Sequence, residues 1–531
     1  MNRRRAAALV SLACAGGLVV PAVSGSSPAA AAAACAAQAP LTWEQPKYVD
    51  ENRAGGEPLV QTHPSGRLMY SSHAGTTHFY SPEAAATGSS AFVENYEGQT
   101  YIWTSDDNGV TWDFRDRDGL LAGTGNNLPA SGFSDPEFSI DSEGGVYFSE
   151  INLANVAVSS STDKGSTWAL QNFFGAVLTD RQWMEADRPG ELYFVANALG
   201  GGTGTPLSPG TGHFISKSTD GGATFTTNIP NPGGIGDLRV DKRNGTVYEV
   251  HYTGGNLSVA AFRNARSGDL TKTDDNIVAE GVRLISSFAA IDLDPSGNVY
   301  ITWDDLGGDE REAGIYYAYS TDAGKTWSQA YQVDDGSGTA IWPWIGVGDD
   351  GRVGIAWLQA DTRLPNNNGE TVGEHGWRVV GAVTTSGLGC ADSRTPVFSR
   401  SVATQDPVHR GTICQSGTIC QATVTDRRLG DYISLDVDNT GRMYVGYSDT
   451  RVDGAVSLPG FVRQAGGPSL VAPKDAGTTP GATTGQPPVA VPPSVVPSAP
   501  QLPATGPSGL VPLAGAVLVL GLVAARRRAR V

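Results

Sequence analysis

The chain alternates short hydrophobic runs with polar turns that end in glycine, and this pattern predicts β-hairpins along most of its length. In each hairpin an apolar strand leads into an Asp-containing or otherwise polar turn. A second apolar strand, usually carrying Tyr, follows the glycine, so each turn joins two β-runs tightly. Seven copies of this hairpin are present, with turns at Gly66, Gly145, Gly190, Gly245, Gly297, Gly351 and Gly441.

A second hairpin pattern recurs between these copies. Four stretches read Ser-x-Asp-x-Gly-x-Thr-aromatic, at 105–112, 161–168, 218–225 and 320–327. The Asp can accept hydrogen bonds from amides of its own turn, the Gly supplies a positive φ, and the aromatic residue anchors the next strand. The repeating unit therefore has four strands, A to D, with a glycine turn between A and B and an octamer between C and D. This unit predicts one blade of a β-propeller.

The two ends of the repeat array complement each other. The segment 42–50 matches the D strand that follows the fourth octamer, residues 326–334, in spacing and residue type, yet no blade precedes it. The last copy, at Gly441, has a C strand near Phe461 and Val462 but no D strand after it. We therefore expect the N-terminal strand to complete the last blade and to remove both open edges of the ring. The predicted fold is all-β, a propeller of seven four-stranded blades.

The octamer resembles the Asp-box, or bacterial neuraminidase repeat, of sialidases and related β-propellers. The resemblance covers most of residues 40–464 and implies a propeller domain there. Sialidases have six blades, so six remains the alternative count. In that family the Asp-box lies on the face away from the ligand site, and proteins that are not sialidases also carry it. The motif therefore predicts the fold more strongly than it predicts a reaction.

Topology places the candidate functional residues around one opening. Both hairpin types turn at the same end of the blades, so the D-to-A and B-to-C connections lie at the other end, which we call the mouth. Functional residues belong there. The starts of the innermost strands should cluster at the mouth, and they carry Asp135, Asp180, Arg181, Asp237, Trp342, Trp344, Asp431 and Tyr432. Trp342 and Trp344 either stack on sugar rings or pack between blades.

Carboxylates crowded together need a compensating charge or a shared proton. Arg181 supplies part of that charge, and Arg239, Arg283 and Arg428 are further candidates. A structural Ca²⁺ is the alternative, although the sequence has no dense oxygen-ligand loop. No cofactor is expected. The alternative role for each of these side chains is structural, as a cap on backbone amides at a strand start.

The sialidase resemblance implies a mechanism as well as a fold. Sialidases use a Tyr nucleophile activated by Glu, an Asp acid/base and three Arg residues that hold the substrate carboxylate. The segment 430–435 resembles the sialidase segment that carries the nucleophile, which makes Tyr432 its candidate here. Asp135 is the candidate acid and Glu249 the candidate activating base. Arg181 is the candidate ligand for a carboxylate, with Asp180, Asp237 and Asp431 as further substrate-binding candidates.

The chain also departs from the sialidase pattern. It has no Arg-Ile-Pro segment near its start, and Arg67 is predicted in a hairpin that faces away from the mouth. Two functions therefore stay open: an exo-glycosidase of sialidase type acting on terminal acidic sugars, and a non-catalytic surface propeller that binds glycan or protein. A polysaccharide lyase is a third option, for which no Tyr/His pair can be placed. Glycans or glycoconjugates are the expected partners, and we expect a monomer.

The ends of the chain predict where it works. Residues 1–34 have three arginines, an apolar run and small residues suited to cleavage, which is the layout of a secretory signal. Lipidation at Cys14 is the weaker alternative.

Residues 502–531 resemble a cell-wall sorting signal, with Leu-Pro-Ala-Thr-Gly, an apolar stretch and an Arg-rich tail. Sortase would cleave after Thr505 and link it to peptidoglycan of a Gram-positive wall; retention as a short membrane span is the alternative. Residues 465–501, rich in Pro, Gly and Thr, are predicted to form the linker across the wall.

Composition agrees with an exported protein. The net charge of -17 over 531 residues argues against a nucleic-acid partner. Cys414 and Cys420 are close enough in sequence for a small-loop disulfide in an oxidising compartment, which leaves Cys35 and Cys390 as the natural second pair. No Cys/His spacing predicts a zinc site.

Overall fold

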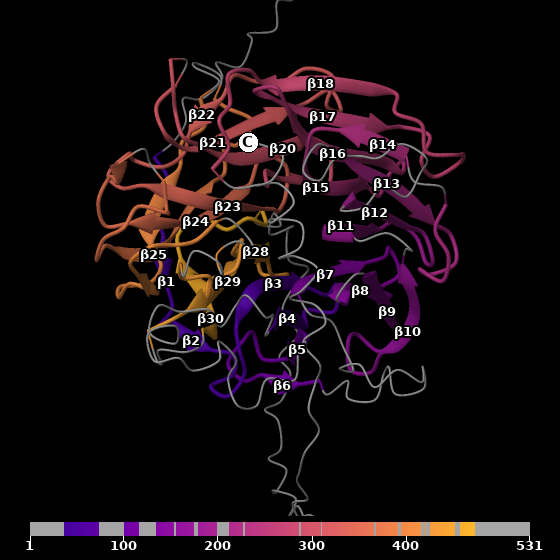
Figure 1. The fold of residues 1–531 in the computed structure, drawn as a ribbon, viewed down its shortest axis with the longest axis horizontal. Helices are drawn as coiled ribbons and strands as arrows, with labels where there is room; N and C mark the ends of the chain where they lie inside the picture. Colours follow the sequence, from indigo (N-terminus) through magenta and orange to yellow (C-terminus); the bar gives the residue numbers. More distant parts are fainter. Residues whose placement is uncertain are drawn as a thin grey trace, which may run out of the picture.

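The computed structural model describes residues 37–73, 100–115, 134–152, 155–174, 179–198, 212–226, 229–285, 288–309, 311–365, 368–390, 395–415, 420, 425–451 and 457–472. Its strands form seven antiparallel sheets, five of four strands and two of five, which follow one another around a ring (Figure 1). The sequence therefore predicted both the all-β propeller and the blade number correctly.

Each of the first five blades runs from the innermost to the outermost strand in sequence order. Blade 1 contains β3 (Gly56–Thr62), β4 (Leu68–His73), β5 (Thr100–Ser105) and β6 (Asp113–Phe114). Blade 2 contains β7 (Ser134–Ile140), β8 (Val146–Asn152), β9 (Asn155–Ser161) and β10 (Ala169–Phe174). Blade 3 contains β11 (Thr179–Ala186), β12 (Leu192–Ala198), β13 (Gly212–Ser218) and β14 (Ile229–Pro232). Blade 4 contains β15 (Gly234–Asp241), β16 (Thr246–Thr253), β17 (Asn256–Phe262) and β18 (Asp274–Ala279). Blade 5 contains β19 (Ala290–Leu293), β20 (Val299–Asp305), β21 (Gly314–Ser320) and β22 (Tyr331–Gln332).

The last two blades are more elaborate. Blade 6 contains β23 (Ala340–Val347), β24 (Val353–Ala360), β25 (Gly376–Thr384) and β26 (Ser399–Val402), with β27 (His409–Arg410) also paired to β25. Blade 7 contains β28 (Ser434–Val437), β29 (Met443–Asp449) and β30 (Leu458–Gly466), to which β1 (Thr42–Trp43) and β2 (Lys47–Tyr48) are added from the start of the described chain.

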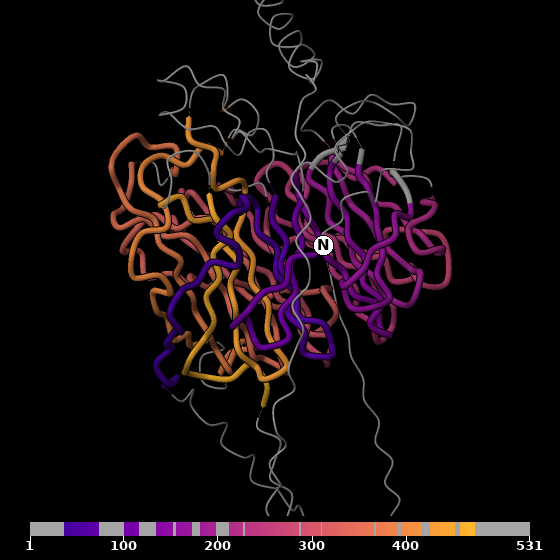
Figure 2. The backbone as a smooth tube through the Cα atoms, turned by 90° about the horizontal axis from the view of Figure 1, so that it is seen from below, coloured from indigo at the N-terminus to yellow at the C-terminus, as the bar shows by residue number. Residues whose placement is uncertain are grey.

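The ring closes as predicted. Trp43 in β1 lies opposite Gln464 in β30, and Lys47 in β2 lies opposite Phe461 of the same strand. Figure 2 shows the indigo N-terminal segment running beside the yellow C-terminal strand. The pairing covers the edge that β30 would otherwise expose, because β30 has β29 on its other side.

The four octamers form nearly identical turns. In the first, Ser105 Oγ donates to Asp107 Oδ1 over 2.8 Å and accepts from the Gly109 N–H over 2.8 Å. Asp107 then accepts from both the N–H and the hydroxyl of Thr111, over 2.9 and 2.6 Å. The other three octamers repeat these contacts. In the fourth, burial acts to raise the pKa of Asp322, but the hydrogen bonds from Thr326 outweigh it and lower the pKa to about 2.

The glycine turns and the octamers lie at the same end of the ring, which we call the octamer face. The Gly221 N–H of the third octamer donates to the Gly190 carbonyl of the glycine turn in the same blade, over 2.9 Å. Arg67 contacts Asp106 of its own octamer and Ser166 of the next, so it faces away from the mouth as predicted. The positive φ of the second glycine turn is at Gly144 rather than at Gly145.

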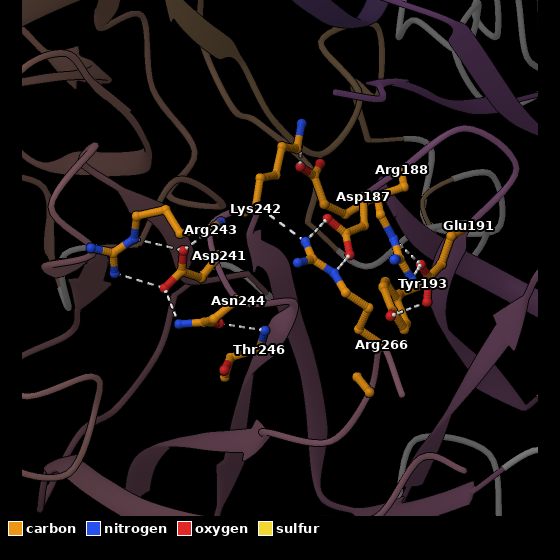
Figure 3. Close-up of polar contacts among 12 residues, drawn as sticks. Asp187, Arg188, Glu191, Tyr193, Asp241, Lys242, Arg243, Asn244, Thr246 and Arg266 are labelled. Atoms are coloured by element: carbon orange, nitrogen blue, oxygen red, sulfur yellow. Dashed lines mark hydrogen bonds and ion pairs between the residues drawn. The ribbon is translucent and has the colours of Figure 1, made fainter. Parts of the chain in front are cut away.

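Arginines join neighbouring blades at this face. Arg266, from the C-to-D connection of blade 4, donates from Nε and Nη2 to the buried carboxylate of Asp187 in blade 3, over 2.7 and 2.6 Å (Figure 3). Blade 4 has no octamer, so Arg266 supplies a contact between blades there. The bidentate geometry is the strong form of an Arg–carboxylate contact.

The propeller continues past the predicted boundary at residue 464. β30 runs to Gly466, and Leu470 is fully buried. The Leu470 N–H donates to the Gly441 carbonyl and its carbonyl accepts from Asp349, each over 2.8 Å. These contacts join the glycine turns of blades 6 and 7, so the chain leaves the described propeller at the octamer face. The buried Leu470 and these hydrogen bonds hold a Pro- and Gly-containing segment on the ring.

Cys414 and Cys420 are joined in a disulfide, and Cys390 is also disulfide-bonded. Cys35, the partner predicted for Cys390, lies outside the described residues. So do the predicted signal at 1–34, the linker from residue 473 and the sorting signal at 502–531 with Thr505. In the described part of the chain no helix is long and apolar enough to span a bilayer.

Candidate functional site

A bulge recurs at the mouth end of the innermost strands. The pairing register shifts within β3, β7, β11, β15 and β23, each time in the first residues of the strand. In four of these strands the bulged residue has a left-handed backbone although it is not glycine: Glu57 (φ 46°), Asp135 (φ 49°), Arg181 (φ 56°) and Trp342 (φ 59°). Such conformations cost energy and gather at functional sites.

Carboxylates of one blade bind the bulged backbone of the next. The Asp135 N–H in blade 2 donates to Glu57 Oε2 in blade 1 over 3.3 Å. The Arg181 N–H in blade 3 donates to Asp135 Oδ2 over 3.2 Å. The Trp342 N–H in blade 6 donates to Asp304 Oδ2 in blade 5 over 2.9 Å. Each carboxylate therefore satisfies an amide that the bulge removes from the sheet ladder.

Charged side chains from blades 1, 2, 3 and 7 meet at these bulges. Glu57 Oε2 lies 2.8 Å from His73 Nε2, and Glu57 Oε1 lies 3.6 Å from Arg427 Nη2. Arg427 also binds Asp431 through two hydrogen bonds of 2.5 Å. Arg181 Nη2 lies 3.3 Å from the same carboxylate. The mouth cluster, as we call it, comprises Glu57, His73, Asp135, Arg181, Arg427, Asp431 and Tyr432.

The environment separates the protonation states of these carboxyl groups. Burial, and then repulsion from Glu57, raises the pKa of Asp135 well above its usual value. Burial, and then repulsion from Asp431, also raises the pKa of Glu57. Asp431 is desolvated too, but Arg427 and Arg181 outweigh burial and lower its pKa to about 2. The cluster therefore raises the pKa of two carboxyl groups and lowers that of the third, which is how acid and base roles separate in active sites.

Tyr432 lies below this charged layer in an aromatic cluster. Its ring centroid is 5.4 Å from that of Trp183, 5.7 Å from that of Trp344 and 6.2 Å from that of Phe288. Its hydroxyl donates to the Pro136 carbonyl over 3.4 Å. Burial raises the pKa of Tyr432 well above 10, and the carboxyl group of Glu57 is the next largest cause. The phenol is therefore neutral at neutral pH.

A second set of carboxylates joins the blades further along the inner strands. Asp237, Asp292 and Asp436 each accept from an N–H of the next blade, at Ile291 (3.4 Å), Val347 (2.8 Å) and Thr62 (2.5 Å). Burial raises the pKa of Asp237 and of Asp292 to about 6, and that of Asp436 to about 7. We call these three residues the lower carboxylates.

The structure brings together four of the sequence-predicted site residues, Asp135, Arg181, Asp431 and Tyr432, with Trp344 packed beneath them. Asp237 belongs instead to the lower carboxylates, where Arg239 pairs with it over 2.8 Å. Trp342 is the buried bulge residue of blade 6. The side chain of Asp180 lies outside the described residues.

Glu249 occupies a different environment from the one expected of an activating base. It is fully buried on β16, where it contacts His213 Nε2 and accepts from Asn231 Nδ2 over 2.7 Å. Both partners are in blade 3, so Glu249 joins blades 3 and 4. Within the described residues its hydrogen-bond partners do not include Tyr432.

Three residues of the mouth cluster, Glu57, His73 and Arg427, were not among the site residues predicted from the sequence. The sequence did contain a signal for Glu57. Three bulged residues directly precede a proline at the start of an inner strand: Glu57, Asp135 and Trp342. Arg427 had no such signal, because it lies in the connection before blade 7. Arg428, a predicted compensating cation, pairs instead with Asp426 over 2.5 Å.

The described residues contain no group of three or more His, Cys, Asp or Glu side chains that could hold a metal ion.

No protein-family model matches the chain, and no curated protein matches it in sequence. Several solved structures are similar. A protein of unknown function from Dyadobacter fermentans is 13% identical, with a TM-score of 0.40. The match covers 80% of this chain and 98% of that protein. An α-L-arabinanase from Penicillium chrysogenum, complexed with arabinobiose, is 11% identical, with a TM-score of 0.41. The match covers 81% of this chain and 99% of the arabinanase chain. A mutant of the NanB sialidase from Streptococcus pneumoniae is 13% identical, with a TM-score of 0.38. The match covers 78% of this chain and 70% of the sialidase chain. The seven-bladed fold itself rests on the strand pairing described above.

Proposed function

We propose that the protein is an exo-acting glycoside hydrolase that removes terminal acidic sugars, displayed on the cell wall of a Gram-positive bacterium. One observation carries the proposal: a carboxyl group with a strongly raised pKa, Asp135, is held beside the cationic Arg181 at the mouth of the ring. A carboxyl group that stays protonated near neutral pH can donate a proton to a departing glycosidic oxygen.

The remaining groups have complementary roles. Arg181 presents a guanidinium group to the carboxylate of the sugar. Tyr432 attacks the anomeric carbon while its phenolic proton passes to a carboxylate, and Asp135 protonates the leaving oxygen as the glycosidic bond breaks. Glu57 supports the base role better than Glu249, since Glu57 lies in the same cluster and affects the pKa of Tyr432 most strongly after burial.

The proposal is tested by hydrolysis of a fluorogenic sialoside by the secreted protein. Tyr432→Phe and Asp135→Asn should each lower kcat by at least about 100-fold. Tyr252→Phe is the matched control, because the Tyr252 hydroxyl also donates to a backbone carbonyl, that of Val282 over 2.8 Å. Equal turnover in all variants, or no turnover of any acidic glycoside by the unaltered protein, would contradict the hydrolase.

A second candidate, glycan binding without turnover, is favoured by the contacts of Tyr432 and of the two arginines. The Tyr432 hydroxyl donates to a carbonyl, and Arg181 and Arg427 both pair with Asp431. Binding on a glycan array in the absence of hydrolysis would select this function.

Wall attachment through Thr505 is part of the proposal and is supported by the sorting-signal resemblance at 502–531. The acidic net charge of -17 supports glycans rather than nucleic acids as partners.

A further inference from the structure

A cavity lies at the mouth outside the mouth cluster. Its volume is about 460 Å³, and it is lined by Arg283, Leu306, Gly307, Gly308 and Asn368. These residues come from three connections: the one that enters blade 5, the B-to-C loop of blade 5 and the B-to-C loop of blade 6. A cavity of this size suits a small ligand of one or two rings.

Hydrogen bonds from its backbone and its side chain hold Arg283 in place. Its N–H donates to Asp305 Oδ1 over 3.2 Å, its carbonyl accepts from Leu306 over 2.8 Å, and its Nη1 donates to the Gly307 carbonyl over 2.9 Å. Asp305 itself is fully buried and pairs with Arg311 over 3.1 Å. Among the described residues no carboxylate forms an ion pair with the Arg283 guanidinium, whose other donors are available to the cavity.

The opposite wall also offers a donor. Asn368 Oδ1 accepts from the Glu370 N–H over 3.0 Å, which orients the side chain and leaves the amide NH₂ as its exposed hydrogen-bonding group. Gly308 adds no side chain to the wall, and a Cβ placed there would meet its nearest neighbour, Arg283 Cδ, only at 3.8 Å. Among the described acids of this loop, Asp309 and Glu312 are exposed and do not line the cavity.

We propose that this cavity is a second binding subsite, which takes a carboxylate-bearing saccharide unit. The carboxylate would bind Arg283, and ring or hydroxyl oxygens would accept from Asn368. A cavity whose polar side chains present donors selects a ligand rich in acceptor oxygens. The choice of a saccharide rests on the proposed function, whereas recognition of the carboxylate rests on Arg283 alone.

The test measures binding of sialyllactose and of neutral lactose to the full secreted protein by titration calorimetry. Arg283→Gln and Gly308→Val should each weaken sialyllactose binding by about tenfold or more, the first by removing the charge and the second by filling the cavity. The matched control is Arg378→Gln, because the half-buried Arg378 also donates from its guanidinium group to a carbonyl, that of Gln405 over 3.0 Å, and does not line the cavity. The control should bind as the unaltered protein does.

The outcomes separate this subsite from the hydrolase. Binding that depends on Arg283 and survives in Asp135→Asn, with no turnover of sialyllactose by the unaltered protein, supports the subsite and contradicts the enzyme. Hydrolysis that is lost in Asp135→Asn, with sialyllactose affinity unchanged in Arg283→Gln and Gly308→Val, overturns the subsite. Equal affinity for lactose and sialyllactose would also overturn it, since the carboxylate would then contribute nothing.

Discussion

The backbone N–H of Arg181 in blade 3 donates to the Asp135 carboxyl group of blade 2 over 3.2 Å. The candidate acid therefore also holds two blades together, and substitutions at this position must separate the two roles. Asn keeps an acceptor for the Arg181 N–H, whereas Ala leaves that amide unpaired.

We expect Asp135→Asn to abolish hydrolysis with little change in stability. Burial, and then repulsion from Glu57, raises the pKa of Asp135 and favours its neutral form, so a neutral amide of the same shape replaces it closely. Asp135→Ala should lower the free energy of unfolding by about 2 kcal/mol, the cost of an unsatisfied buried amide. Urea unfolding of both variants measures the difference. A large loss of stability in Asp135→Asn would show that the carboxyl group is ionised.

The lower carboxylates predict that the propeller loses stability as pH rises. Burial raises the pKa of Asp436 from 3.8 to about 7, and those of Asp237 and Asp292 to about 6, so the folded state binds protons that the unfolded state has already released. Their contribution is complete below about pH 4 and is lost as pH rises through 6 to 7.

For Asp436 alone the change between pH 5 and pH 8 is about 3 kcal/mol. Urea unfolding at the two pH values measures it, and Asp436→Asn should reduce the pH dependence. Asp322→Asn is the control, because the pKa of Asp322 is lowered to about 2 and Asp322 does not titrate in this range. A protein that is more stable at pH 8 than at pH 5 would contradict this account.

The closing strand depends on a close contact between Trp43 and Gly381. A Cβ placed on Gly381 would lie 2.3 Å from Trp43 Cζ2. We expect Gly381→Ala to destabilise the ring by about 1–3 kcal/mol, the usual cost of overpacking. The cost should shrink in a Trp43→Ala background, because the indole would no longer be there. Additive effects in this double-mutant cycle would show that the two residues do not interact.

The Cys414–Cys420 disulfide should support the mouth cluster as well as stability. The Cys414 N–H donates to the Asp426 carbonyl over 2.8 Å, next to Arg427. Replacing both cysteines by serine should cost about 2 kcal/mol from the lost constraint on a short loop. If Arg427 positions Asp431, the variant should also bind acidic sugars more weakly. Unchanged affinity with reduced stability would confine the disulfide to a folding role.

Removal of residues 502–531 should release the protein into the culture medium, since the proposed sortase signal would be lost. Cell fractionation with antibody detection measures the distribution. Thr505→Ala is the narrower variant, because it alters the proposed attachment residue and leaves the apolar stretch in place. Retention of the truncated protein on the wall would contradict covalent anchoring.

The sequence was sufficient for the fold because its repeats are local. Trp43 could be assigned to the last blade since its neighbours match those of Trp327, and the octamer turns are built from hydrogen bonds between residues four apart. The boundary at residue 464 fell short because residues 465–472 are held on the ring by the buried Leu470 and by hydrogen bonds to distant turns, neither of which forms a sequence pattern.

The site was less predictable because its contacts join distant blades. Glu57 and Asp135 are 78 residues apart, and only their common position before a proline links them. Glu249 looked available as a base because His213, its partner 36 residues away, cannot be inferred from spacing. The lower carboxylates likewise accept amides from strands 54 to 374 residues distant.

Under the proposed wall attachment, the position of Leu470 has a consequence for the orientation of the molecule on the cell surface. The polypeptide departs from the underside of the ring, beside the glycine turns of blades 6 and 7. A tether that continues from there towards peptidoglycan would point the opening outwards, into the surroundings. Large glycans on a neighbouring cell could then approach Arg181 and Asp135 without first passing through the wall.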